Sequence, residues 1–191
     1  TDGTRELLRK YAAQDKRIKL IEEKFISIAA ALNIGLKASQ GMYIARVDAD
    51  NMLFPEFLTE HIEYLDKHPD IELVSADQLK IDENDNVIGM IPFLITDYAM
   101  KKHLLFKTAF GGAPMVGKSS TFFYVGLYEE RTIITEDRIF ALKAIHKKCA
   151  TLNSINYAYR IHSGAITQRY KKTAEHQKTV QEYEHKFIKP E

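Results

Sequence analysis

The chain has 191 residues, of which 45% are hydrophobic and 28% are charged, so it suits one globular domain and excludes a disordered or fibrous protein. Lysine and arginine number 27 against 26 aspartates and glutamates, and the net charge of +1 gives no general electrostatic reason to bind nucleic acid or an anionic membrane. The single cysteine, Cys149, excludes an intramolecular disulfide and a four-cysteine zinc site.

The first half of the chain predicts alternating helices and strands. Leu7, Leu8 and Tyr11 recur at helical spacing, and Met42–Val47 is apolar enough for a strand buried on both sides. This alternation favours a largely parallel sheet with helices on both faces. The expected elements are a helix over 4–14, a strand over 19–21, a helix that Ser27 caps and Gly41 ends, a strand over 42–47, a helix from Pro55 to His68, and strands at 71–75, 79–81 and 87–88.

The second half is less regular. The glycine, proline and aromatic content of residues 89–118 predicts a long, partly ordered segment of the kind that covers a site. A helix is expected over Glu136–His146, an extended segment over Thr151–Ile161 and a terminal helix over 168–187. No internal repeat or interdomain linker is visible, so residues 1–191 are predicted to form a single domain.

Two aspartates directly follow the predicted strand over 42–47. Asp48 and Asp50 are spaced i and i+2, so on an extended backbone their carboxylates point to the same side. Two oxygen donors at the carboxyl end of a buried strand suit Mg²⁺ or Mn²⁺ shared with a phosphate-bearing ligand. A turn rich in Asp and Asn after a strand is also ordinary turn chemistry, so the spacing alone leaves both interpretations open.

Several short motifs follow one another along the whole chain. They are Asn33-Ile34-Gly35-Leu36, Gly41-Met42-Tyr43-Ile44-Ala45, Asp48-Ala49-Asp50-Asn51, Pro55, Thr135-Glu136-Asp137 and Tyr159-Arg160-Ile161-His162. In type and order this set resembles the family 2 glycosyltransferases of the GT-A fold. The resemblance implies an α/β domain with a Rossmann-like, mostly parallel central sheet flanked by helices, and a C-terminal helix.

The resemblance also implies a donor site for a nucleoside diphosphate sugar. Asp50 would bind a Mn²⁺ or Mg²⁺ ion that holds the diphosphate, and Asp48 would lie nearer the ribose or behind the metal. His162 would be a further metal ligand or a diphosphate contact, although an exposed loop histidine is the ordinary alternative. Arg160 would pair with phosphate oxygens or form an ordinary salt bridge, and Asn33 would belong to the donor side.

Asp137 is the residue that the resemblance assigns to the acceptor. Its carboxylate would take the proton from the acceptor hydroxyl as that hydroxyl attacks the anomeric carbon, with inversion. Such a base needs to lie within about 3 Å of the hydroxyl. The alternative is that Glu136 and Asp137 only open a helix, where acidic side chains favour the dipole. The assignment depends on Asp48, Asp50 and Asp137 gathering around one cavity.

The chain departs from the family pattern in three places. The family has a strand, a helix and a second strand before the segment that residues 1–4 resemble. Leu32 stands where the family has an arginine, and Lys24-Phe25-Ile26 stands where it has a loop with glycine. These positions touch the donor side and predict an altered donor choice or weaker catalysis. The nucleotide-sugar half is expected over about 1–88 and the acceptor half over about 89–165.

Residues 112–119 carry a rival motif. Gly112-Ala113-Pro114-Met115-Val116-Gly117-Lys118-Ser119 matches the P-loop pattern of nucleotide hydrolases. Pro114 removes one of the N–H groups that a phosphate cradle needs, and little chain follows for the rest of such a sheet. A second near-motif, Asp82, Asn84 and Asn86, imitates a calcium loop but lacks its Gly and Glu, so a turn is expected.

The prediction is a metal-dependent, inverting transferase of a sugar from a nucleoside diphosphate sugar to a hydroxyl of a glycan or lipid-linked acceptor. The alternatives are a P-loop hydrolase at 112–119 and a non-catalytic binding module of the same fold. No nucleic-acid partner is expected. No apolar run approaches the ~20 residues that span a bilayer, so the protein is expected in the cytoplasm, with peripheral association at the inner face of the membrane left open.

Overall fold

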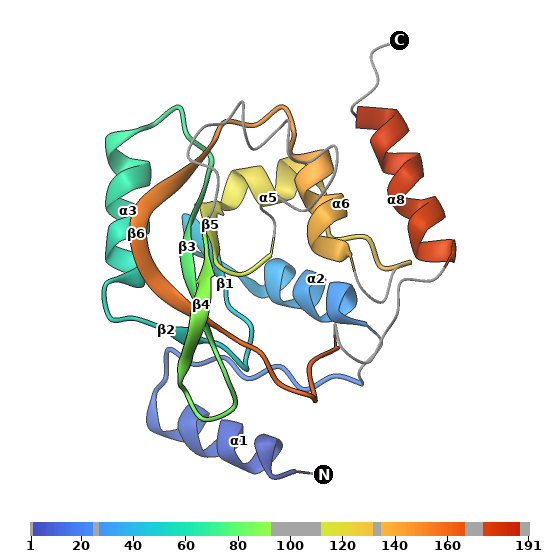
Figure 1. Cartoon of the computed structure of the whole chain (residues 1–191). Coiled ribbons are helices and arrows are strands. Elements are labelled where there is room, and N and C mark those ends of the chain that lie inside the picture. Colours follow the sequence, from blue (N-terminus) through green and yellow to red (C-terminus); the bar gives the residue numbers. More distant parts are fainter. Residues whose placement is uncertain (1, 25–26, 93–111, 132–134, 167–173, 188–191) are drawn as a thin grey trace.

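The computed structural model describes residues 2–24, 27–92, 112–131, 135–166 and 174–187 (Figure 1). Within these ranges no helix has both the length and the apolar character needed to cross a membrane. The described helices are α1 (Thr4–Gln14), α2 (Ile28–Ala38), α3 (Phe57–Lys67), α5 (Ser119–Val125), α6 (Glu136–Lys143) and α8 (Ala174–Phe187). The described strands are β1 (Tyr43–Arg46), β2 (Met52–Leu53), β3 (Leu73–Ile81), β4 (Val87–Ile91), β5 (Met115–Lys118) and β6 (Cys149–Arg160).

These strands form one sheet in the order β1-β5-β3-β6-β2. Strand β4 lies outside this order and pairs with the C-terminal part of β3. Only β3 and β6 pair in parallel, and every other pairing is antiparallel. The prediction of a mostly parallel sheet is therefore wrong. Strand β5 runs back between β1 and β3 and accounts for two of the four antiparallel pairings, and the strands β2 and β4 account for the other two. Strand β5 lies within residues 89–118, where the sequence predicted no strand.

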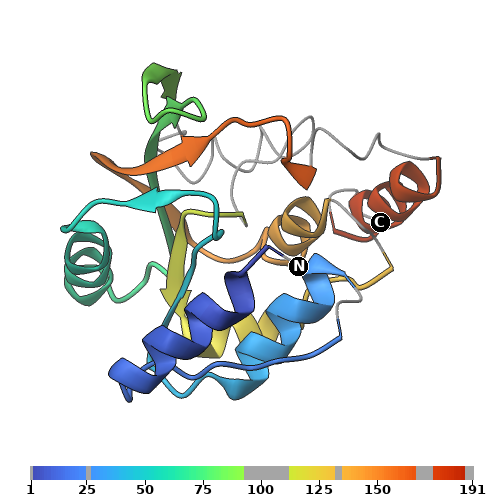
Figure 2. The same ribbon diagram turned by 90° about the horizontal axis from the view of Figure 1, so that it is seen from below.

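Helices cover both faces of this sheet, as predicted. Alternation along the central strands sends neighbouring side chains to opposite faces. Leu73 and Met115 join one core with α2, α5 and α6, whereas Val74 and Val116 join another core with α3. Figure 1 shows α3 on one side of the sheet and α2, α5 and α6 on the other. The β3–β4 hairpin extends beyond both cores (Figure 2).

The local predictions mostly hold. The helix over 4–14 is confirmed, and Ser27 caps α2 because its side chain accepts a hydrogen bond from Ala30 N at 3.1 Å. Residues 19–21 form no strand, because this segment pairs with no strand of the described residues and leaves Ile21 43% exposed. The helix α2 ends at Ala38 with Ser39 as its C-cap, before the predicted stop at Gly41. The terminal helix is described from Ala174 onward, and most of the segment predicted to cover a site, residues 93–111, lies outside the described residues.

The P-loop interpretation of residues 112–119 is wrong. Residues 115–118 are the strand β5, paired on one side with β1 and on the other with β3, so their N–H groups belong to the sheet. The Lys118 Nζ donates to the carbonyl of Pro69 at 2.5 Å, away from any glycine-rich loop. The calcium-like segment is a turn, as expected, in which Asp82 Oδ1 accepts from the backbone of Asn84 and Asn86.

Candidate active site

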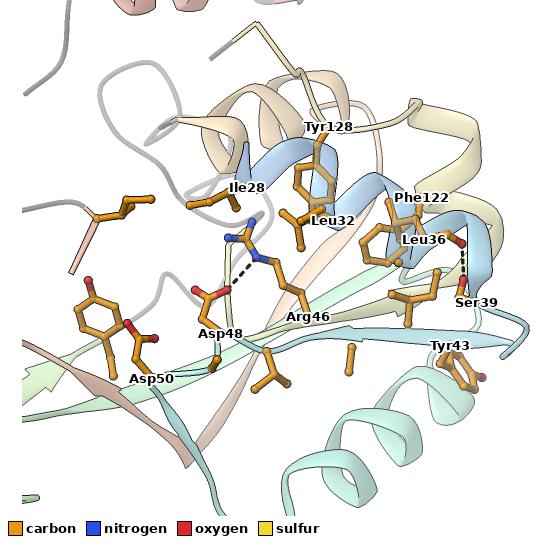
Figure 3. Close-up of a pocket in the computed structure, with 18 of the residues that line it drawn as sticks. Ile28, Leu32, Leu36, Ser39, Tyr43, Arg46, Asp48, Asp50, Phe122 and Tyr128 are labelled. Carbon is orange, nitrogen blue, oxygen red and sulfur yellow. Dashed lines mark hydrogen bonds and ion pairs between the residues drawn. The ribbon is translucent and has the colours of Figure 1, made fainter. Parts of the chain in front are cut away.

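A pocket of about 900 Å³ lies between helix α2 and strand β1 (Figure 3). One end is apolar, with Leu36 and Phe122 among its lining residues. Arg46, Asp48 and Asp50 form the other end, where β1 stops. The two predicted aspartates therefore face the same pocket, at its polar end.

A turn follows β1 and separates the two carboxylates. The backbone N–H of Asn51 donates to the carbonyl of Asp48 at 3.2 Å, so the chain reverses over residues 48–51. Of the two interpretations that the spacing left open, the turn describes this backbone, and the extended backbone does not. Asp48 turns back toward Arg46, and Asp50 lies farther along the pocket wall (Figure 3).

Strand β6 brings the predicted His162 to Asp50. The short strand β2 pairs with β6 in the register Met52 to Ala158, which draws the preceding turn toward the end of β6. The Nε2 atom of His162 lies 3.1 Å from Oδ2 of Asp50. The side chains are 26% and 43% exposed, so both remain open to a ligand.

Arg160 supports the same turn from the side. Its backbone N–H donates to Oδ1 of Asn51, and its Nε donates to the carbonyl of Asp50 at 2.9 Å. Its Nη1 also reaches the Asp85 carboxylate at 2.5 Å. Arg160 thus forms the ordinary salt bridge that was predicted as one of its two roles. Its contact with a phosphate stays a prediction.

The acceptor motif joins the site through Arg46. Arg46 Nη2 donates to Oε1 of Glu136 at 2.9 Å, and its Nε lies 3.3 Å from Oδ1 of Asp48. The Arg46 and Glu136 side chains are only 7% and 8% exposed. Asp137 follows Glu136 at the start of α6, and its Oδ1 accepts from the N–H of Arg138 at 2.7 Å. Asp137 therefore lies near enough to Asp48 for the two charges to interact, but it does not line the pocket that Asp48 and Asp50 line, so its place at the same cavity stays a prediction.

Three carboxylates share the single guanidinium of Arg46. Burial raises the pKa of Asp137, against the opposing effects of Arg46 and the Arg138 amide, and Asp48 adds to the rise. Burial and then the Asp137 charge also raise the pKa of Glu136, although Arg46 opposes them. Burial lowers the pKa of Arg46, but its acidic neighbours outweigh that effect and raise it overall. Glu136 and Asp137 therefore hold a proton more tightly here than they would in water, chiefly because they are buried.

Asn33 lies outside the lining of this pocket. Its Nδ2 donates to the carbonyl of Tyr128 and to Glu130, and its Oδ1 accepts from the N–H of Tyr128 at 2.8 Å. The amide therefore fastens α2 to the segment after α5. The predicted donor contact of Asn33 stays a prediction, and any effect on the site would pass through Tyr128.

Sequence reasoning missed Arg46, Tyr128 and Tyr157. Tyr128 lies under the Arg46 guanidinium, which is 5.5 Å from its ring centroid, and burial raises the pKa of Tyr128 to about 12. Burial and then Asp48 raise the pKa of Tyr157, which lies beneath the turn. Of these three residues, only Arg46 could have been found from the sequence, because a charged residue inside an otherwise apolar strand requires a buried partner.

The residues at the turn fit a metal ion for which the protein supplies only some of the ligands. In the described part of the chain, no group of three or more His, Cys, Asp or Glu side chains can hold a metal ion. Mg²⁺ commonly takes one or two carboxylates and completes its shell with water and substrate phosphates. The 3.1 Å between Asp50 and His162 is a hydrogen-bond distance, and it also suits neighbouring ligands on an octahedral ion with bonds of about 2.1 Å.

Comparison with known sequences identifies relatives of this chain. The family model described as glycosyl transferase family 2 matches residues 1–131. A protein of Bacillus subtilis named "Putative glycosyltransferase EpsE" is 41% identical over 85 residues, which make up 44% of this chain and 31% of EpsE. The chain thus spans about a third of the length of this curated relative.

Solved structures share the fold. S. aureus TarS 1–349 in complex with UDP-GlcNAc matches 100% of this chain and 56% of its own, with a TM-score of 0.75 and 15% identity. GalNAc-T7 with UDP, GalNAc and Mn²⁺ matches 98% of this chain and 42% of its own, with a TM-score of 0.65 and 16% identity. At these identities the likeness concerns the fold alone, which is the predicted GT-A fold.

Proposed function

This chain belongs to glycosyl transferase family 2, and we propose that it moves a sugar from a nucleoside diphosphate sugar to a hydroxyl of a glycan or lipid-linked acceptor, with inversion. One observation carries the proposal. Arg46 joins the aspartate turn after β1 to the start of α6, so the second acidic motif is anchored to a residue that lines the polar end of the pocket, although Glu136 and Asp137 do not line it themselves. The UDP-GlcNAc complex of TarS supports a nucleotide-sugar donor.

The donor side of the proposed reaction is the turn over residues 48–51. Asp50 and His162 would hold a Mn²⁺ or Mg²⁺ ion, in keeping with the Mn²⁺ in the GalNAc-T7 structure. A divalent cation at this place stabilises the negative charge of the departing diphosphate. Asp48 lies between this pair and Arg46 along the pocket wall, where it would orient the donor near its ribose.

The acceptor side is the start of α6. The acceptor oxygen would attack the anomeric carbon, and its proton would pass to the Asp137 carboxylate. The bond from the anomeric carbon to the diphosphate oxygen breaks, and its electron pair stays on the diphosphate. Burial raises the pKa of Asp137, which makes its carboxylate a better base than an exposed aspartate.

The test is a melting-temperature screen of the full-length protein with UDP, UDP-GlcNAc and GDP-Man, each with and without Mn²⁺, followed by an assay of nucleotide release. A nucleotide that binds the folded protein at 100 times its dissociation constant should stabilise it by about 2.7 kcal/mol. We expect a larger shift with Mn²⁺ than without it. A protein that binds none of these compounds and releases no nucleotide from either sugar conjugate contradicts the proposal.

A matched pair of variants tests whether the Mn²⁺-dependent shift in melting temperature arises at Asp50. Asp50→Ala should abolish the Mn²⁺-dependent part of the shift. Asp70→Ala removes another exposed aspartate, one that pairs with Lys148 at 3.1 Å and does not line the pocket, so its shift should equal that of the wild type. Equal shifts in both variants would place the metal elsewhere.

A further inference from the structure

Arg46 is a buried cation at the last position of β1. Its side chain is 7% exposed, with Asp48 at 3.3 Å from Nε and Glu136 at 2.9 Å from Nη2. The guanidinium carbon lies over the ring of Tyr128, 5.5 Å from its centroid. A guanidinium carries its N–H donors in a rigid planar fork, so contacts from two of its nitrogens fix the direction of both partners.

The two partners belong to separate parts of the chain. Asp48 stands in the turn after β1, and Glu136 is the first residue of α6, 90 residues after Arg46. Because Glu136 and Asp137 are consecutive, an anchor on Glu136 also fixes the backbone that carries Asp137. The same guanidinium therefore sets the position of the donor-side turn relative to the proposed base.

The entry into α6 shows that its start is held in place. Thr135 precedes Glu136 with φ 78° and ψ 8°, in the left-handed region. A β-branched residue adopts this conformation only when the surrounding structure imposes it. The ion pair between Arg46 and Glu136 supplies a constraint of this kind directly after the strained residue.

We propose that Arg46 is a positioning residue that couples the donor and acceptor sides of the site. It holds Asp48 directly and Asp137 through Glu136. The proposal rests on the proposed sugar transfer, because it assigns Arg46 a part in that reaction. A displacement of about 1 Å at a catalytic group can cost a factor of about 10² in rate, so loss of this link should lower turnover more than donor binding.

The first test compares Arg46→Met and Arg46→Lys in the full-length protein, with UDP-GlcNAc or GDP-Man and Mn²⁺. We expect kcat to fall about 10²-fold in Arg46→Met and about tenfold in Arg46→Lys, since one ammonium cannot reproduce the planar fork. The donor KM should change less than kcat. Full kcat in Arg46→Met would overturn the proposal.

The second test separates positioning from stability. The double variant Arg46→Met with Glu136→Met replaces the buried ion pair by apolar side chains, an exchange that is often neutral or stabilising. Its melting temperature should return toward that of the wild type, while kcat stays about 10²-fold low because the link that Arg46 makes between Asp48 and α6 is gone. If kcat recovers together with the melting temperature, Arg46 is only structural and the proposal is wrong.

Lys147→Met is the matched control. Lys147 pairs with Glu72 at 3.1 Å, is 20% exposed and does not line the pocket, so its loss should change kcat less than twofold. A wild-type protein that transfers sugar from neither donor would remove the proposed function and the role of Arg46 in it. A double variant that turns over like the wild type would remove only the role of Arg46.

Discussion

Two acidic centres lie around Arg46 and Asp50, which line the polar end of the pocket, and they are built in opposite ways. At the Arg46 centre, Glu136 is 8% exposed and its charge is paired inside the protein. At the Asp50 centre, Asp50 and His162 are 43% and 26% exposed and lie 3.1 Å apart. A buried charge without its partner is costly, whereas an exposed pair contributes little.

The difference separates what the chain completes for itself from what it leaves to a ligand. The Arg46 centre has its partners within the protein, so it serves geometry and stability. The Asp50 centre presents open donor atoms, so its contribution should emerge only when a metal and a diphosphate are present. Substitutions at the two centres should therefore show their effects in different assays.

The largest expected effect is on turnover in Asp137→Asn. A positioned general base contributes about 10²- to 10⁴-fold, so nucleotide release should fall by a factor in that range while donor binding survives. The amide keeps the shape of the side chain and removes a carboxylate whose pKa burial raises. Release of UDP from UDP-GlcNAc measures the change, with Asp70→Asn as control. Full activity would remove Asp137 as the base.

The second largest expected effect is on the free energy of unfolding of Arg46→Met. This change leaves Glu136 buried without its partner, which should cost about 3–5 kcal/mol in urea denaturation. His162→Gln at the exposed pair should cost less than about 1 kcal/mol. Equal losses in the two variants would contradict the contrast between the centres.

His162→Gln should reveal its effect only with ligand. With Mn²⁺ and UDP at 100 times the dissociation constant, the wild type should gain about 2.7 kcal/mol, and the variant should lose most of that gain. The melting temperature without ligand serves as the reference. A variant that keeps the full Mn²⁺-dependent gain would exclude His162 as a ligand.

A smaller effect concerns pH. Burial raises the pKa of Asp137 in the folded protein, where Arg46, Asp48, Glu136 and Tyr128 are the charged and titratable groups acting on it. The folded state then binds the proton more tightly than the unfolded state. This contribution favours folding below the ordinary aspartate pKa and is lost as pH rises through the raised value, at no more than about 1.4 kcal/mol per pH unit.

Asp137→Asn tests the sign of this dependence. The variant minus wild-type difference in unfolding free energy should grow in favour of the variant as pH rises, because the variant has no carboxyl to ionise. Urea denaturation at a series of pH values measures it. A difference that shrinks with rising pH would mean that Arg46 outweighs burial and lowers the pKa of Asp137.

Lys118→Ala should have the smallest effect. Lys118 ends β5 and contacts the carbonyl of Pro69, so turnover should stay within about twofold and stability within about 0.5 kcal/mol. A nucleotide hydrolase with a P-loop would lose its activity in this variant. Nucleotide release by Lys118→Ala and by the wild type can be compared directly.

Much of the fold could be predicted because its signals are local. The apolar stripe of α2 and its Ser27 cap fix that helix without knowledge of its neighbours. The Asp48 and Asp50 pair marked the end of β1 for the same reason. The antiparallel course of β5 could not be predicted, because the stretch before it has no period and strand direction depends on which neighbours the chain meets.

The same distinction between local features and long-range contacts applies to the site. The sequence by itself determined which acidic motifs exist and in what order, since each motif is a run of neighbouring residues. Only the tertiary structure decided between the two backbone conformations that the sequence left open at residues 48–51, and only it showed that Arg46 pairs with Glu136 across 90 residues. A buried charge takes whichever partner packing brings within reach, and packing is a property of the whole chain.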